Sequence, residues 1–177
     1  MFLLASAGCG APVETAHTLG DQPAESVDAA QDERSDVKSV EDRADGVPVS
    51  SILRLSKPVA KRGEEIELVV ELRIAPMWEI HTLNAQPDLT ATKLEVLAPT
   101  GISLEGPWHE PETSRSVNPP GHLVHVGRAV FKRKLAVDAD ATAGTHEISC
   151  QIAFQACNEH QCLKPQERTL KVPLVIE

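Results

Sequence analysis

Cys157 and Cys162, near the C-terminal end, are the residues whose types and spacing most directly indicate chemistry. Asn, Glu, His and Gln lie between them, and all four are polar and able to turn. Strand-like segments at 148–156 and 167–176 flank the pair, which predicts a β-hairpin with a cysteine at each edge of its loop. Such a hairpin can bring two Cα atoms within the roughly 4.4–6.8 Å that a disulfide requires.

Three interpretations of this pair are open from its spacing. A structural clip over so short a loop yields only about 2 kcal/mol in the chain-entropy model, against about 4.7 kcal/mol for a loop of 100 residues. Short and exposed bridges are often the labile, redox-active ones. A metal site is the third interpretation, because His160 lies between the thiols and Cys150 is near in sequence. Zinc ligands usually show a two-residue gap and a second ligand pair, so we expect no metal and no cofactor here.

Scattered histidines offer a variant of the metal interpretation. They could meet in space and bind copper or zinc with the cysteines, but isolated surface histidines are the commoner case. They are His81, His109, His122 and His125.

Composition limits the classes of partner. The chain has 177 residues, enough for one ordinary domain, and a net charge of −9. It contains two Trp, three Phe and no Tyr, so it lacks the basic stripe and interleaved aromatics that single-strand binders use. We therefore expect no nucleic-acid partner.

The N-terminus resembles a truncated bacterial lipoprotein signal. A short apolar run, Phe2–Ala5, precedes Ser6-Ala7-Gly8-Cys9, in which small residues stand directly before a cysteine. Ser6 stands where Leu is usual and no basic residue precedes the run; a start codon assigned too late would explain both. The alternative is a chance cysteine in a disordered tail. We expect lipidation of Cys9, export to a compartment where disulfides persist, and anchoring without a membrane span.

The chain divides into three parts on composition. Residues 1–9 are the signal or lipobox remnant, and residues 10–47 form a disordered acidic linker. This linker holds ten acidic and three basic residues and shows no hydrophobic periodicity. It cannot bury enough apolar surface to offset its ordering entropy. Residues 48–177 form the folded domain.

Alternating hydrophobicity dominates this domain. Apolar side chains at every second position from Ile66 to Ile74 indicate a strand with one buried face. Similar patterns, separated by Gly and Pro turn signals, predict about seven short strands. The fold class that this favours is all-β, an immunoglobulin-like β-sandwich preceded by the acidic tether. The clearest expected strands are 51–55, 66–74, 93–97, 129–137, 146–156 and 170–176.

The same alternation gives expectations for each cysteine. Cys150 shares parity with Ile148 and Ile152, so it should be a buried, structural thiol. Cys157 has the opposite parity and on that ground should reach the surface. A comparison of Cys157 with Cys162 gives a second expectation, about which of the two is more exposed. Cys162 precedes a proline that tends to hold the strand start open, so Cys157 should be the more enclosed of the two.

Several segments resemble the N-terminal periplasmic domain of the thiol:disulfide interchange protein family DsbD. The specific part is Phe154-Gln155-Ala156-Cys157 followed by Cys162, Pro165 and Val172-Pro173-Leu174. Met77-Trp78-Glu79-Ile80-His81 and Trp108-His109-Glu110-Pro111-Glu112 resemble two upstream segments of the family, the second being the start of its cap loop. The similarity covers roughly residues 48–177 in the right order.

This resemblance implies an immunoglobulin-like domain that relays electrons between thioredoxin-like partners, a protein-disulfide reductase type of activity. Cys162 would form the mixed disulfide with the partner and Cys157 would resolve it. Phe154, His160, Glu112 and Trp108 would surround the pair.

The implied partners are thioredoxin-like redox proteins and a membrane electron transporter. The family's electron-supplying domains are not in this sequence, so we expect a free-standing, monomeric, lipid-anchored or secreted form on the periplasmic side of a bacterial membrane.

The sequence also departs from the family. Segment 112–116 lacks the cap-loop aromatic, and Phe154 stands where the family has a tyrosine. These departures keep a second hypothesis open, a non-catalytic immunoglobulin-like lipoprotein binding module with a static disulfide. His160 could stabilise a thiolate or be a solvated loop residue, whereas Glu159 would oppose a thiolate.

Overall fold

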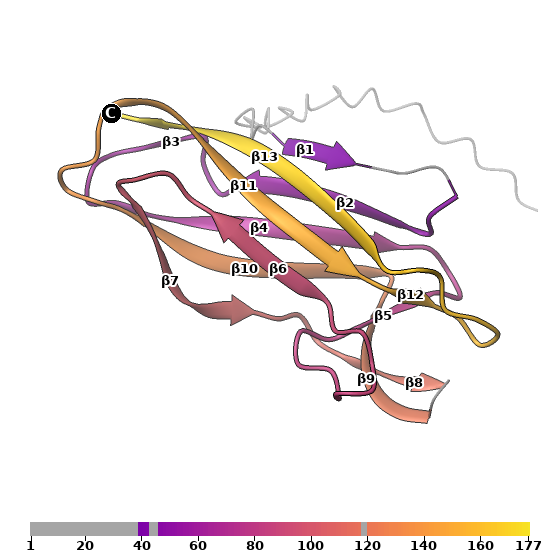
Figure 1. Cartoon of the computed structure of the whole chain (residues 1–177). Helices are drawn as coiled ribbons and strands as arrows, with labels where there is room; N and C mark the ends of the chain where they lie inside the picture. The colour runs from indigo at the N-terminus through magenta and orange to yellow at the C-terminus, as the bar shows by residue number, and fades with distance from the viewer. Residues whose placement is uncertain (1–38, 43–45, 118–119) are drawn as a thin grey trace, which may run out of the picture. The chain divides into compact units, whose positions relative to one another are not determined.

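The computed structural model describes residues 39–42, 46–117 and 120–177, and these residues form strands connected by turns and loops (Figure 1). The strands are β1 (Ser39–Asp42), β2 (Val49–Leu55), β3 (Val59–Ala60), β4 (Glu65–Ile74), β5 (Glu79–His81), β6 (Lys93–Leu97), β7 (Ile102–His109), β8 (Ser114–Val117), β9 (Pro120–Val126), β10 (Arg128–Val137), β11 (Gly144–Phe154), β12 (Ala156–Cys157) and β13 (Gln166–Ile176).

Two sheets form the sandwich. One has the strand order β1-β2-β4-β10-β7 and the other has the order β3-β13-β11-β6. Their pairings are antiparallel except for the short parallel contact between β13 and β3. Figure 1 shows the long strands β11 and β13 in front of β4 and β10. The fold is therefore the expected all-β, immunoglobulin-like sandwich.

The core follows from alternation on the four longest strands. Inward-facing side chains of β4, β10, β11 and β13 are fully or almost fully buried, with Phe131 and Phe154 the largest. Each such side chain contributes about 1.5–3 kcal/mol relative to an exposed one. Cys150 belongs to this core with 0% exposure, as its parity predicts.

A third, smaller sheet with the order β12-β5-β9-β8 positions the cysteines. The chain leaves β11 at Phe154, passes through Gln155, and pairs again as β12 with β5. This change of sheet brings the cysteine hairpin alongside a segment about 80 residues earlier in the sequence.

The structure differs from the sequence-based expectations at the short strands. Residues 39–42, assigned above to the linker, form β1 along the edge of β2. Arg168 of β13 supports this strand, because its Nη1 donates to the Asp42 carbonyl (3.0 Å). Both Cys9 and most of the predicted linker lie outside the described residues. No helix long and apolar enough to span a membrane occurs in the described part of the chain.

Glu71 of β4 is an acidic residue on the side of the strand opposite the core, yet it is buried. Its carboxylate accepts hydrogen bonds from Arg128 Nη2 (2.7 Å) and Arg73 Nε (2.8 Å). These two guanidiniums, Arg128 first, lower the pKa of Glu71 from 4.5 to about 2 against the opposing effect of burial. The ionised carboxylate therefore stabilises the fold.

We expect Glu71→Gln to lower the free energy of unfolding at pH 7. A pKa shift of this size corresponds to about 3 kcal/mol, and solvent around the two exposed guanidiniums reduces it, so about 1–3 kcal/mol is expected. Because the folded pKa is depressed, the stabilisation is present above pH 4.5 and is lost as the pH falls toward about 2. Urea unfolding at several pH values measures this.

The matched control is Glu65→Gln, which removes an exposed carboxylate paired with Lys134 on the same two strands. It should cost less than about 1 kcal/mol. If Glu71→Gln lowers the free energy of unfolding by the same amount near pH 2 as at pH 7, then packing, and not charge, is responsible for the loss.

Candidate functional site

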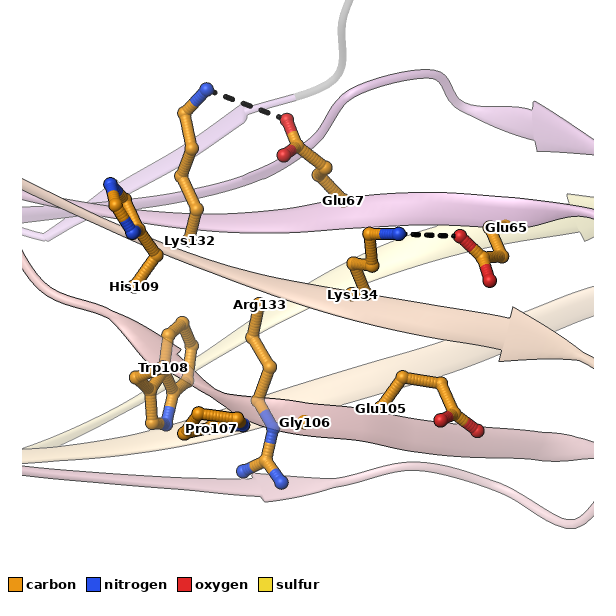
Figure 2. Close-up of a pocket in the computed structure, with 10 residues that line it drawn as sticks. All are labelled: Glu65, Glu67, Glu105, Gly106, Pro107, Trp108, His109, Lys132, Arg133 and Lys134. Atoms are coloured by element: carbon orange, nitrogen blue, oxygen red, sulfur yellow. Dashed lines mark hydrogen bonds and ion pairs between the residues drawn. The ribbon is translucent and has the colours of Figure 1, made fainter.

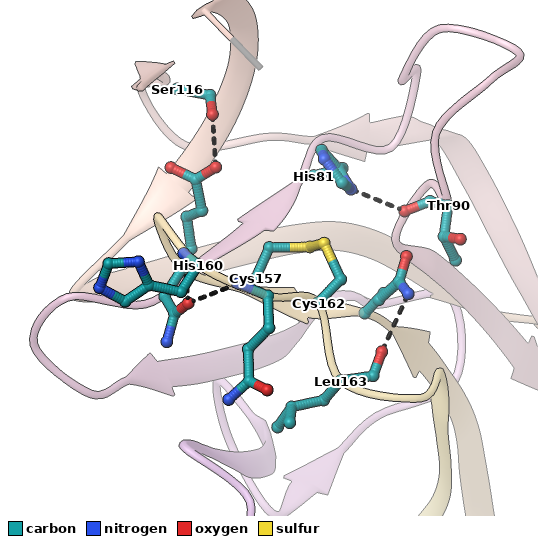
Figure 3. Close-up of a disulfide and its surroundings, with 11 residues drawn as sticks. His81, Thr90, Ser116, Cys157, His160, Cys162 and Leu163 are labelled. Carbon is teal, nitrogen blue, oxygen red and sulfur yellow. Dashed lines mark hydrogen bonds between the residues drawn. A yellow bond between two sulfur atoms is a disulfide. The ribbon is translucent and has the colours of Figure 1, made fainter. Parts of the chain in front are cut away.

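The disulfide closes the hairpin between β11 and β13. Cys157 and Cys162 are bonded, with their Cα atoms 4.0 Å apart (Figure 3). The amide of Leu163 donates to the Ala156 carbonyl (2.9 Å), which continues the antiparallel pairing past the bridge. The two sulfurs therefore lie on a short ladder that extends from the sandwich.

Asn158 forms the turn between the cysteines. Its side-chain Oδ1 accepts hydrogen bonds from the amides of His160 and Gln161, each at 2.9 Å, and its amide donates to the Gln161 carbonyl (2.9 Å). Asn is favoured at such positions because its short side chain can satisfy the backbone of the following residues. The predicted four-residue polar turn is thus an ordered loop.

The two sulfurs differ in exposure. Cys157 is 1% exposed, whereas Cys162 is an exposed residue. The parity prediction that Cys157 reaches the surface is wrong. The buried alternation of β11 continues through Phe154 to Ala156, but in β12, which pairs with β5 of the small sheet, both residues are buried, Cys157 included. The prediction that Cys157 is the more enclosed of the pair agrees with the structure.

A buried acidic residue is the ladder neighbour of the enclosed cysteine. Glu79 of β5 is the register partner of Cys157 and is 8% exposed. Partners in a β-ladder share one face of the sheet. The Ser116 hydroxyl of β8 donates to the Glu79 carboxylate, and Figure 3 draws Ser116 among the residues around the disulfide. Sequence reasoning missed both residues, because only the long-range pairing of β5 with β12 places them here.

A surface pocket of about 410 Å³ adjoins this carboxylate. Met77 at its rim is 75% exposed and has a positive φ of 70°. Non-glycine residues adopt that backbone conformation uncommonly, and such positions concentrate at functional sites. Sequence reasoning missed the exposure of Met77, although Met is a common residue of adaptable binding surfaces. The lining residues include Met77, Trp78, Glu79, Arg115, Val126 and Glu159.

The other residues that the sequence predicted around the disulfide lie in the core, before β8 and in the hairpin loop. Phe154 lies in the core, and the guanidinium carbon Cζ of Arg168 lies over its ring, 5.3 Å from the ring centroid. Glu112 is exposed just before β8. His160 lies in the hairpin loop, and its Nε2 is 3.0 Å from Glu159 Oε1.

Trp108 lies in a different part of the molecule. It lines an open pocket of about 720 Å³ along β7, β10 and β4, together with the Lys132–Glu67 and Lys134–Glu65 pairs (Figure 2). Its indole Nε1 donates to the Leu94 carbonyl (3.1 Å). Trp108 is not among the residues that line the pocket beside the disulfide.

Two histidines that were expected on the surface are buried in the small sheet. His81 Nδ1 lies 3.2 Å from the Thr90 carbonyl, and His125 Nε2 lies 2.9 Å from Glu110 Oε1. His81 belongs to β5, all three residues of which are buried, and His125 lies in the buried part of β9 next to Val124. Among the described residues, no group of three or more His, Cys, Asp or Glu side chains could hold a metal ion.

Cys150, the third described cysteine, is chemically distinct from the pair. It is a free thiol in the core, and burial raises its pKa to about 12. A thiol with so high a pKa carries almost no thiolate at neutral pH, and the thiolate is the form that reacts. Cys150 is therefore not part of the candidate site, which contains the sulfurs of Cys157 and Cys162.

Comparisons with known proteins place the fold. No family model and no curated protein matches the chain. The structure is similar to the N-terminal periplasmic domain of ScsB from Proteus mirabilis, with a TM-score of 0.54 and 14% identity. This match covers 78% of the present chain and 51% of the ScsB chain, so the present chain spans about half of that structure.

Weaker matches include the reduced N-terminal domain of DsbD from Neisseria meningitidis. Its TM-score is 0.40 at 16% identity, covering 72% of this chain and 85% of that chain. The GAE domain of GGA2p from Saccharomyces cerevisiae matches with a TM-score of 0.44 at 8% identity, covering 78% and 100%. At 14% identity the ScsB match shows a shared fold alone: the present chain is a sandwich similar to that of the ScsB periplasmic domain, and it carries a disulfide between Cys157 and Cys162.

Proposed function

We propose that the domain is a thiol–disulfide exchange module that relays electrons between thioredoxin-like partners outside the cytoplasmic membrane. The observation that carries the proposal is the unequal exposure of the two bonded cysteines, Cys157 buried and Cys162 exposed. A static clip has no need of such asymmetry, whereas exchange requires one sulfur that a partner can attack and one that is shielded.

The chemistry follows from this asymmetry. A thiolate of a reduced partner attacks Cys162 Sγ, the Cys157–Cys162 bond breaks, and Cys157 leaves as a thiolate that takes up a proton. The partner's second thiolate then attacks its own sulfur in the mixed disulfide and releases Cys162. Two electrons pass from the partner dithiol to the domain, and the reverse sequence passes them to an oxidised partner.

The environment that we propose matches this chemistry. A disulfide that is cycled by partner proteins suits an exported protein, and one similar structure is a periplasmic domain by name. We further propose that lipidated Cys9 anchors the protein, that the remaining residues of the N-terminal 47 act as a tether, and that a membrane electron transporter is the ultimate reductant. These three parts stay predictions from the sequence.

Redox titration of the full chain tests the proposal. Mild reductant should open the Cys157–Cys162 bond while the domain remains folded, with a potential above about −300 mV. Near-ultraviolet circular dichroism reports the fold, and thiol alkylation followed by mass spectrometry reports the bond. A potential below about −300 mV is typical of structural disulfides and would favour a non-catalytic binding module instead.

A further inference from the structure

Glu79, an almost fully buried acidic residue, is the ladder neighbour of Cys157, the cysteine that has to act as the resolving group. Glu79 and Cys157 are register partners on β5 and β12, so their side chains share one face of the small sheet. Directly opposed residues in such a ladder have Cβ atoms about 4.5–5.5 Å apart. Both residues are almost fully shielded from solvent.

The position of the carboxylate is fixed by other elements. Ser116 of β8 donates its hydroxyl to Glu79, and Val126 of β9 is the register partner on the other side. His81 shares this face, two residues from Glu79 on β5, and the charged residues Arg115 of β8 and Glu159 of the hairpin loop line the pocket that Glu79 also lines. A carboxylate on the residue paired with Cys157 disfavours a thiolate on that cysteine, because like charges in a shielded site repel.

We propose that Glu79 holds Cys157 as the protonated thiol whenever the disulfide is open, leaving Cys162 as the nucleophile of the pair. This inference rests on the proposed exchange function and assigns Glu79 as the residue that controls the resolving step. In a mixed disulfide on Cys162, a protonated Cys157 is slow to attack in return. The partner's second thiol then has time to complete the transfer of electrons.

The test uses reduced full-length protein carrying Cys9→Ser and the aromatic disulfide DTNB as the probe. The Cys162 thiolate attacks DTNB, forms a mixed disulfide and releases one thionitrobenzoate. Cys157 then loses its proton to water, attacks Cys162 Sγ and releases the second thionitrobenzoate as the Cys157–Cys162 bond forms. The second release is unimolecular, so its rate does not depend on the DTNB concentration.

Glu79→Gln should accelerate this second release at pH 7 by about threefold or more. If the pKa of the Cys157 thiol falls by one unit, its thiolate fraction at pH 7 rises about tenfold. A less basic thiolate is also a weaker nucleophile, which offsets about threefold of this gain. The same variant should reach a lower plateau rate at high pH, so that the two pH profiles cross. Glu79→Asp, which keeps the charge, should stay close to wild type. Glu65→Gln removes a distant exposed carboxylate and should leave the profile unchanged.

A second variant leaves Glu79 in place. Val126 is 47% exposed and lies opposite Glu79, so Val126→Lys places a cation across the ladder without altering the core. It should also accelerate the second release, whereas Val126→Gln should not. If the second release is unchanged or slower in Glu79→Gln, the inference is overturned. A slower release would show that the Glu79 carboxylate instead accepts the proton of Cys157. Failure of wild type to form any second thionitrobenzoate would instead contradict the proposed exchange function.

Discussion

Cys157→Ala is expected to accumulate a mixed disulfide through Cys162 with a thioredoxin-like partner, whereas Cys162→Ala should trap little or nothing. The reason is access: Cys162 is an exposed residue that a partner can reach, while Cys157 is buried in β12. Without Cys157 no internal thiol can resolve the adduct, so it persists. The difference in trapped mixed disulfide between the two variants should therefore be close to all-or-none.

Pull-down of each variant under non-reducing conditions, with the linkage mapped by mass spectrometry, measures the difference. Cys150→Ala is the matched control, because it removes a thiol of the same domain that takes no part in exchange. The opposite trapping pattern would reverse the roles of the two cysteines. Absence of adducts from both variants, with both still folded, would favour the static-disulfide module.

Cys150 provides the second large effect. In the native protein at pH 8 an alkylating agent should leave it unlabelled, because a pKa of about 12 leaves about one thiolate in 10,000 and the core closes over the sulfur. In denaturant it should be labelled as fast as an ordinary thiol. After mild reduction, Cys162 in the same sample should react promptly and serves as the internal reference. Prompt labelling of Cys150 in the folded chain would contradict its place in the core.

The long strands could be predicted from the sequence because each has one face packed in the core. Alternation at 66–74 and 129–137 matches β4 and β10 to within one or two residues. The strands β5, β8 and β9 could not be predicted in this way. They are short or irregular, and their pairing depends on partners far away in the chain.

The candidate site divides along the same line. The disulfide pair follows from cysteine spacing and hairpin signals, which are local. The burial of Cys157 does not, since it results from the move of the chain from one sheet to another at Gln155. Segment 77–81 resembles a segment of the DsbD family, but nothing in it distinguishes Glu79, because a single acidic residue before an isoleucine looks like any strand edge. The pairing of Glu79 with Cys157 becomes visible only in three dimensions.

The ladder between β11 and β13 has a consequence for the reduced state. Eleven register pairs join these strands, from Gly144–Ile176 to Phe154–Gln166, just before the chain departs into the cysteine loop. Breaking the sulfur–sulfur bond leaves this ladder intact, so the two thiols stay tethered at a high effective concentration. Ring closure then requires little further loss of chain entropy. An open pair on this scaffold is thus predisposed to close again and to give up its electrons to whichever oxidised partner reaches Cys162.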